Sequence, residues 1–247
     1  MVVLKKNREI EKMREAGRRL AEIMLLIRKW VGPGLKTAEL DRFVRGEIRK
    51  KKAEEAFSSQ GFPAAICTSV NEEIVHGIPG DYVIREGDIL SVDIGLKYRE
   101  YYADMAETFG VGKISSAAEK LIAVTRDSLR EGIDRLYPAN TLGDVGYGIQ
   151  KKVEENGFFV VRDFVGHGIG TKLQEDPQVP NYGTRGRGQV IQEGMVLALE
   201  PMVTAGPPKV KIKKDGWTAV TADGSLAAHF EHTVAVTDHG PEVLTVV

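Results

Sequence analysis

The sequence predicts an α+β fold with central antiparallel strands and outer helices. Three observations lead to this expectation. Apolar residues recur at helical spacing in four stretches, other stretches alternate apolar and polar residues, and the order of helices followed by strands occurs twice. The chain has 247 residues, 42% of them hydrophobic and 28% charged, with a formal net charge of -1. This composition is typical of a soluble globular protein.

The first half begins with two predicted helices. Apolar residues recur every three or four positions from Glu9 to Val31, and Gly32-Pro33-Gly34 ends this helix. A second helix begins at the N-cap residue Thr37 and runs into the charged stretch 49–55. Strands are expected to follow, at 64–70, 88–95 and 101–109.

The second half repeats this order. Ser115 caps a helix that runs to Pro138, a second helix extends from Thr141 to Glu155, and short strands follow at 158–161 and from 189 onward. Both the Pro-containing break and the helix-starting Thr recur after about 105 positions. We expect one domain, residues 1–247, with related halves at about 1–112 and 113–247. Two α+β units that match by coincidence remain an alternative, because identity between the halves is slight.

Charge, cysteine content and hydropathy exclude several classes of protein. The near-zero net charge argues against binding DNA or RNA through a global positive field. The single cysteine, Cys67, excludes an internal disulfide and a cysteine-based zinc cluster, and it fits a reducing compartment. No apolar run approaches the roughly 18 residues that span a bilayer, and the N-terminus resembles no secretion signal. We expect a cytoplasmic protein without a membrane partner.

Four acidic residues lie in apolar strand contexts that contain no Lys or Arg: Asp93, Asp104, Glu200 and Glu231. A buried carboxylate needs a partner, and a divalent cation is the simplest candidate. Together with the glycine-flanked His167, these carboxylates suit Mn, Fe, Co or Zn. Taken singly, each acid would be interpreted as a strand-edge residue that faces water. The chain has no Walker sequence, no G-x-S-x-G and no H-E-x-x-H.

The sequence resembles type I methionine aminopeptidases, in their short bacterial form, over essentially its whole length. The matching segments appear in that family's order; they are Asn71–Pro79, Ser91–Gly95 followed by Asp104, Gly166–Gly170, Glu200-Pro201-Met202 and Phe230–Thr233. The resemblance implies the pseudo-two-fold pita-bread fold. It also implies a metal-dependent hydrolase that removes the initiator methionine from nascent proteins with a small second residue.

The resemblance assigns roles to nine residues that match the family pattern. It implies that two divalent ions (Co, Mn, Fe or Zn) are held by Asp93, Asp104, His167, Glu200 and Glu231. Asp104 and Glu231 would bridge the ions, Asp93 would hold one, and His167 with Glu200 would hold the other. Glu200 would also be the general base. His76 would contact the substrate's peptide group, and the methionine pocket would contain Phe62, Cys67 and Trp217. From residue type alone, His76 is an ordinary loop residue and the other three are core residues.

Gln174 departs from the family pattern, which has a second histidine seven positions after His167. The amide can donate a hydrogen bond to the substrate carbonyl, but it cannot carry a proton. Gln174 is therefore compatible with a natural variant of modest activity, an inactivating substitution or an altered function. A non-catalytic binding module and a proline-specific peptidase are the other hypotheses, although the latter usually needs an additional N-terminal domain.

Partners follow from the same hypothesis. The expected partner is the N-terminal methionine of nascent polypeptides, with the enzyme acting as a monomer. Four lysines of one predicted hairpin either contact ribosomal RNA transiently or protect an exposed strand edge; they are Lys209, Lys211, Lys213 and Lys214.

Overall fold

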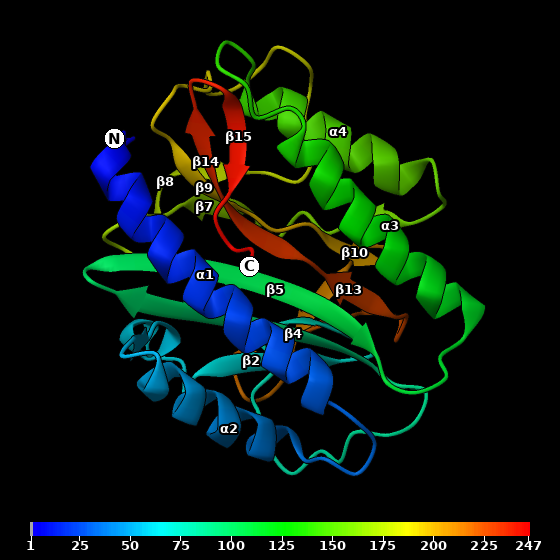
Figure 1. Ribbon diagram of the computed structural model, residues 1–247. Helices are drawn as coiled ribbons and strands as arrows, with labels where there is room; N and C mark the ends of the chain where they lie inside the picture. The colour runs from blue at the N-terminus through cyan, green and yellow to red at the C-terminus, as the bar shows by residue number, and fades with distance from the viewer. Residues whose placement is uncertain (1) are drawn as a thin grey trace.

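A nine-stranded sheet forms the centre of the computed structural model, which describes residues 2–247 (Figure 1). Its strands pair antiparallel in the order β1-β4-β5-β14-β9-β7-β8, with β2 added to β4 and β15 added to β14. The bounds are β1 Glu54–Glu55, β2 Ile66–Val70, β4 Ile89–Tyr98, β5 Tyr101–Gly110, β7 Gly166–Gly168, β8 Glu175–Val179, β9 Val196–Leu199, β14 Glu231–Thr237 and β15 Gly240–Val243.

Two small antiparallel sheets complete the strand layer. One has the order β13-β10-β6, with β13 Ala227–His229, β10 Met202–Thr204 and β6 Phe159–Val160. The other has the order β11-β12-β3, with β11 Val210–Ile212, β12 Ala219–Thr221 and β3 Glu73–Val75. Strand β11, which contains Lys211 and is flanked by Lys209, Lys213 and Lys214, therefore lies at a sheet edge, as one of the two interpretations of these lysines requires.

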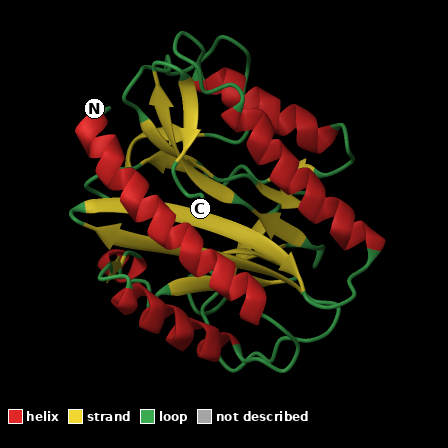
Figure 2. Cartoon of the chain, in the orientation of Figure 1, coloured by secondary structure: helices red, strands yellow, loops and turns green. Residues whose placement is uncertain are grey.

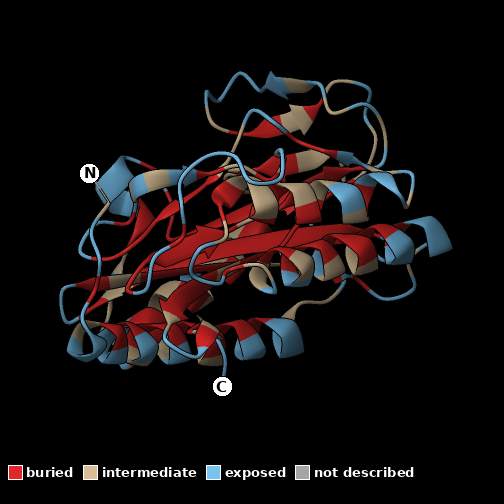
Figure 3. Cartoon of the chain, turned by 90° about the horizontal axis from the view of Figure 1, so that it is seen from above, coloured by how far each residue is buried: buried red, intermediate tan, exposed pale blue. Residues whose placement is uncertain are grey.

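The helices lie outside the strands, as the sequence predicts (Figure 2). They are α1 Asn7–Trp30, α2 Thr37–Lys50, α3 Ser116–Ile133 and α4 Leu142–Glu154, with a short 3-10 helix, η1, at Phe57–Gln60. In Figure 1, α1 and α3 lie in front of the sheet. The view from above in Figure 3 shows buried residues along the strands and on the helix faces turned toward them. Within residues 2–247, no helix combines the length and hydropathy that crossing a membrane requires.

The apolar stripe of α1 is the largest helical contribution to the core. Met13, Leu20 and Ile27 are fully buried, and much of this stripe packs with Leu90 and Val92 of β4. Burying such a side chain stabilises a fold by about 1.5–3 kcal/mol. Gly17 lets the C-terminal segment cross this helix closely, because a Cβ there would lie 2.2 Å from the carbonyl oxygen of Leu244.

The local signals for the later helices are confirmed, whereas two predicted helix ends and one cap are wrong. The side chains of Ser115 and Thr141 cap α3 and α4. The second helix ends at Lys50, and residues 54–55 pair with β4 instead. The third ends at Ile133 rather than Pro138, in turns where Leu136 N donates to Ile133 O. Thr37 is the first residue of α2, and Lys36 occupies the cap position; the Thr37 hydroxyl donates to Gly80 O and accepts from Gly80 N.

Candidate metal centre

A cavity of about 230 Å³ brings together all ten residues that the sequence singles out. Its wall contains Phe62, Cys67, His76, Asp93, Asp104, His167, Gln174, Glu200, Trp217 and Glu231. Three residues that the sequence analysis did not select also line it: Phe57, Gln60 and Leu173. Their aromatic, amide and aliphatic side chains carry no distinctive sequence signal, so no pattern could have selected them.

Neighbouring strands place the five acidic and imidazole side chains. Asp93 and Asp104 come from the paired strands β4 and β5, and Glu231 begins β14, where it lies opposite Ala106 of β5. His167 lies on β7 opposite Ala198 of β9, and Glu200 follows the end of β9. Because these strands are neighbours in one sheet, residues more than 100 positions apart reach the same cavity.

The donor set of this cavity fits a divalent metal. Possible ligand atoms of Asp104, His167 and Glu231 lie within 4.8 Å of one another. Among residues 2–247, Asp93 Oδ1, Asp104 Oδ1 and Glu231 Oε1 are buried and have no hydrogen-bond partner. Buried carboxylate oxygens without a partner are costly, and carboxylates with imidazole are ligands that Mn, Fe, Co and Zn accept. The orphaned oxygens therefore agree with the predicted cation site.

The pKa values of the four buried carboxylates also indicate a cation site. Burial raises the pKa of Asp93 to about 7. Burial, followed by repulsion from neighbouring carboxylates, raises the pKa values of Asp104, Glu200 and Glu231 well above their usual range. Without a cation these groups favour their neutral forms, whereas metal binding requires them to be deprotonated. Such perturbed carboxylates gathered in a cavity are typical of a functional site.

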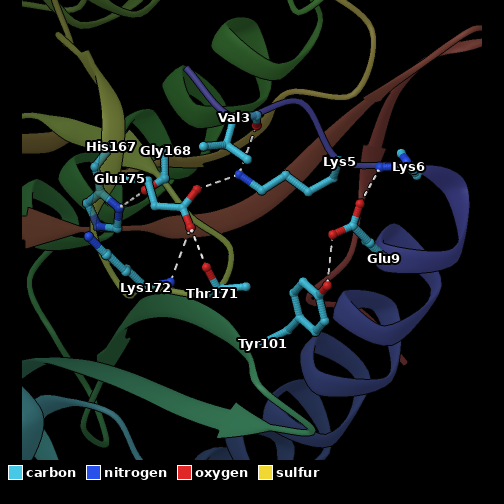
Figure 4. Close-up of polar contacts among 10 residues, drawn as sticks. All are labelled: Val3, Lys5, Lys6, Glu9, Tyr101, His167, Gly168, Thr171, Lys172 and Glu175. Carbon is cyan, nitrogen blue, oxygen red and sulfur yellow. Dashed lines mark hydrogen bonds and ion pairs between the residues drawn. The ribbon is translucent and has the colours of Figure 1, made fainter. Parts of the chain in front are cut away.

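The tautomer of His167 suits metal binding. Its Nδ1 lies 2.9 Å from the carbonyl oxygen of Gly168 (Figure 4). A carbonyl can only accept, so Nδ1 carries the proton and Nε2 keeps its lone pair. Nε2 lies 3.7 Å from Glu200 Oε1, inside the carboxylate cluster. Burial lowers the pKa of His167, which favours the neutral form that a ligand needs.

Aromatic and sulfur groups form the other wall. The rings of Phe62 and Trp217 pack edge to face with centroids 5.3 Å apart, and both residues belong to the same apolar cluster as Cys67. Burial raises the pKa of the Cys67 thiol well above its usual range. A thiol held neutral in this way is no nucleophile, and Cys67 is a wall residue.

His76 reaches the cavity from a strained backbone position after β3. Its φ is 60°, in the left-handed region that few non-glycine residues adopt. Hydrogen bonds hold the next residue, because Gly77 N donates to Ser69 Oγ and Gly77 O accepts from Thr68 N. The His76 ring packs edge to face against Phe164 at 5.5 Å and Trp217 at 6.5 Å. Strain of this kind is concentrated at functional sites.

Gln174 immediately precedes Glu175, a residue that is tied to Lys5 of the N-terminal segment (Figure 4). The next residue, Glu175, accepts hydrogen bonds from Lys5 Nζ at 2.5 Å and from Lys172 N at 3.1 Å. Lys5 Nζ also donates to Val3 O at 3.0 Å. Gln174 itself lines both the 230 Å³ cavity and a wider hollow of about 660 Å³ beside it.

The sequence analysis missed His229, the last residue of β13. Its Nε2 lies 3.8 Å from Glu200 Oε2, and possible ligand atoms of Glu200, His229 and Glu231 lie within 4.8 Å of one another. Burial lowers the pKa of His229 to about 3. Its position two residues before Glu231 was the available signal, since alternate residues of an extended segment share a side.

Comparison with known proteins identifies the family. Residues 11–238 match metallopeptidase family M24. The chain is also 51% identical over 248 residues to a methionine aminopeptidase of Clostridium perfringens, with 100% of both chains covered. The chain belongs to the methionine aminopeptidases of family M24. A crystal structure of methionine aminopeptidase from Thermotoga maritima has a TM-score of 0.98 and 46% identity, and the match covers 100% of both chains.

The family assignment confirms the predicted resemblance, pita-bread fold and enzyme class. This M24 chain is a metallo-exopeptidase and hydrolase. A prolidase from Pyrococcus furiosus has a TM-score of 0.78 at 19% identity, covering 99% of this chain and 66% of that one. At that identity the likeness concerns the fold alone, and a prolidase-like activity is not favoured.

Proposed function

We propose that this enzyme removes the N-terminal methionine from nascent proteins with a small second residue, through a dinuclear metal centre. One observation carries the proposal. Five potential metal ligands share a cavity with an apolar wall of Phe62, Cys67 and Trp217. The ligands are Asp93, Asp104, His167, Glu200 and Glu231. This juxtaposition suits a hydrolytic centre beside a pocket for one thioether side chain.

The proposed ligand roles are those that the family resemblance implies. Asp104 and Glu231 would bridge two divalent ions, Asp93 would bind one, and His167 with Glu200 would bind the other. Orphaned oxygens on Asp93, Asp104 and Glu231 support this assignment. Two ions of Co, Mn, Fe or Zn would supply a water of lowered pKa and a Lewis acid for the scissile carbonyl.

The remaining polar residues handle protons and orient the substrate. Glu200 would accept the proton of the attacking water and pass it to the leaving amine, because its carboxylate lines the cavity beside His167. His76 would contact the substrate's peptide group. Gln174 would donate an amide hydrogen bond to the carbonyl oxygen as negative charge develops on it.

Location and partners belong to the same proposal. We place the enzyme in the cytoplasm as a monomer that acts on nascent polypeptides. Lys213, which follows β11, pairs with Glu73 at 2.5 Å, and this supports the interpretation of the four lysines in and around β11 as protection for a strand edge. Transient ribosome contact by these lysines stays a prediction.

Methionine release tests the proposed function. A peptide that begins Met-Ala should lose methionine when Co²⁺ or Mn²⁺ is added, and a peptide that begins Met-Leu should be cleaved much more slowly. Glu200→Gln provides the control for contaminating peptidases, because it removes the proposed base. Absence of release with every metal, even after Gln174→His, would overturn the proposal.

A further inference from the structure

His229 is a buried imidazole to which the proposed function gives no role. The residue is 1% exposed, and its Nε2 has no hydrogen-bond partner within residues 2–247. Buried polar atoms are nearly always paired, so an orphaned ring nitrogen requires an explanation. Glu200 Oε2 lies 3.8 Å from this nitrogen, and a carboxylate oxygen of Glu231 lies within 4.8 Å of a ring nitrogen of His229.

Glu200 lies between two imidazoles. Its Oε1 is 3.7 Å from His167 Nε2, and its Oε2 is 3.8 Å from His229 Nε2. His167 lines the cavity, whereas His229 does not. His229 therefore approaches the carboxylate of Glu200 without forming part of the cavity wall.

The backbone of His229 is held firmly. Its N–H donates to Thr108 Oγ1 at 2.8 Å, and its carbonyl oxygen accepts from the same hydroxyl at 2.8 Å. His229 also lies opposite Met202 in the pairing of β13 with β10. Met202 comes two positions after Glu200 in the sequence. The sheet thus fixes the ring beside the carboxylate, and a ring fixed in this way can orient a flexible side chain.

We propose that His229 is a positioning residue of the metal centre, with Nε2–H donating to Glu200 Oε2. This inference rests on the proposed function of Glu200. An N–H···O bond spans 2.7–3.2 Å, so the present gap closes when the Glu200 carboxylate moves by about 0.6 Å or more. The bond would leave Oε1, on the side of His167, free to hold a metal ion. Mutation of a residue that hydrogen-bonds to a metal ligand typically lowers metal affinity or activity by about 10–100-fold.

The same geometry raises one competing role. The ligand atoms of Glu200, His229 and Glu231 are close enough together for His229 to bind an ion directly. The two roles predict different spectra. With Co²⁺ bound, a positioning role gives one hyperfine-shifted exchangeable imidazole N–H signal, from His167, and direct ligation gives two.

The experiment compares three variants with the wild-type enzyme by Mn²⁺ titration calorimetry, kinetics on a Met-Ala peptide and proton NMR of the Co²⁺ form. His229→Leu removes the donor, and His229→Gln keeps an amide donor. His232→Gln is the matched control. His232 is a largely buried histidine on β14 whose Nδ1 lies 2.8 Å from Thr245 Oγ1, and it does not line the cavity.

We expect His229→Leu to bind Mn²⁺ about 10–100-fold more weakly and to lose kcat with little change in KM. His229→Gln should recover most of both losses, and His232→Gln should keep wild-type metal affinity even where its melting temperature falls. If His229→Leu does not fold, His229→Ala carries the same comparison.

Two results would overturn the inference: metal affinity in the folded donor-free variant equal to that of His232→Gln, or two imidazole signals in the Co²⁺ form. Failure of the proposed function looks different, because the wild-type enzyme would then release no methionine whatever the His229 variants do. A wild-type protein without metal affinity would overturn both.

Discussion

Lys5 and Glu175 form a buried ion pair that ties the segment before α1 to the loop carrying Gln174 (Figure 4). Their side chains are 3% and 8% exposed, and Nζ lies 2.5 Å from Oε2. Breaking a buried pair by removing one partner leaves a charge without compensation. The pair connects residues 170 positions apart, and one of them adjoins the candidate site.

Lys5→Met should lower the free energy of unfolding by about 3–5 kcal/mol, because it leaves the Glu175 carboxylate buried and unpaired. Urea unfolding measures this loss. Arg14→Met is the matched control: it removes a pair with Glu242 whose side chains are 46% and 36% exposed, and such pairs contribute at most about 1 kcal/mol. Adding Glu175→Gln to Lys5→Met should restore part of the stability. Equal losses for Lys5→Met and Arg14→Met would contradict the prediction.

Gln174→His should raise kcat more than it changes KM, because the hydrogen bond to the carbonyl oxygen matters most in the transition state. Loss of a whole oxyanion donor costs about 10²–10³ in rate, so the gain over an existing amide donor should be smaller than that. Steady-state kinetics on a Met-Ala peptide measures it. Gln178→His, in the neighbouring hollow but outside the smaller cavity, should change neither constant. An unchanged kcat in Gln174→His would show that the amide is an adequate replacement.

Removal of metal should destabilise the enzyme, because four buried acids then face one another without a cation. A ligand at 100 times its dissociation constant stabilises the folded state by about 2.7 kcal/mol. Thermal unfolding with Mn²⁺ and with EDTA measures the difference. Asp104→Asn, which removes a proposed bridging ligand, should show little difference in melting temperature between Mn²⁺ and EDTA. A melting temperature that is the same with metal and with chelator would argue against a resident ion.

Without metal, Asp93 should make the protein less stable as pH rises. Its folded pKa is about 7, above the roughly 3.9 of an unfolded aspartate, so the folded state binds more protons between these values. The stabilising contribution is complete below about pH 4 and is lost as pH rises through 7. Urea unfolding in EDTA at pH 5.5 and pH 7.5 tests this loss of stability against Asp93→Asn, which should lose less, because only Asp104, Glu200 and Glu231 then contribute to it. Parallel pH profiles for the two proteins would contradict the prediction. Added metal should reverse the trend, because it binds the deprotonated ligands.

Trp217→Ala should lower kcat/KM for Met-led peptides by about tenfold, because it opens one wall of the proposed methionine pocket. The chain offers its own control, since Trp30 is the other tryptophan and packs on Phe43 at the surface, with 42% of its area exposed. Trp30→Ala should leave kcat/KM unchanged. If both variants lose activity equally, Trp217 has no specific part in binding methionine.

The sequence by itself determined the helices, most of the strands and the carboxylate set. Helical periodicity and the caps at Ser115 and Thr141 are local, so neighbouring residues carry the signal. Asp93 and Asp104 were visible because acids without basic neighbours stand out in apolar strands. Helix ends were less accurate, since pairing of residues 54–55 with β4 depends on a strand that begins more than 30 positions later.

The tertiary structure decided which side chains meet. His167 reaches Glu200 because β7 pairs with β9, and His229 reaches the other oxygen of the same carboxylate from β13 in a different sheet. Lys5 reaches Glu175 across 170 positions. Such contacts follow from the order of strands and from close packing, which act between residues far apart in the chain. A local sequence pattern cannot predict these contacts, because no residue near His229 in the sequence specifies that Glu200 lies beside it.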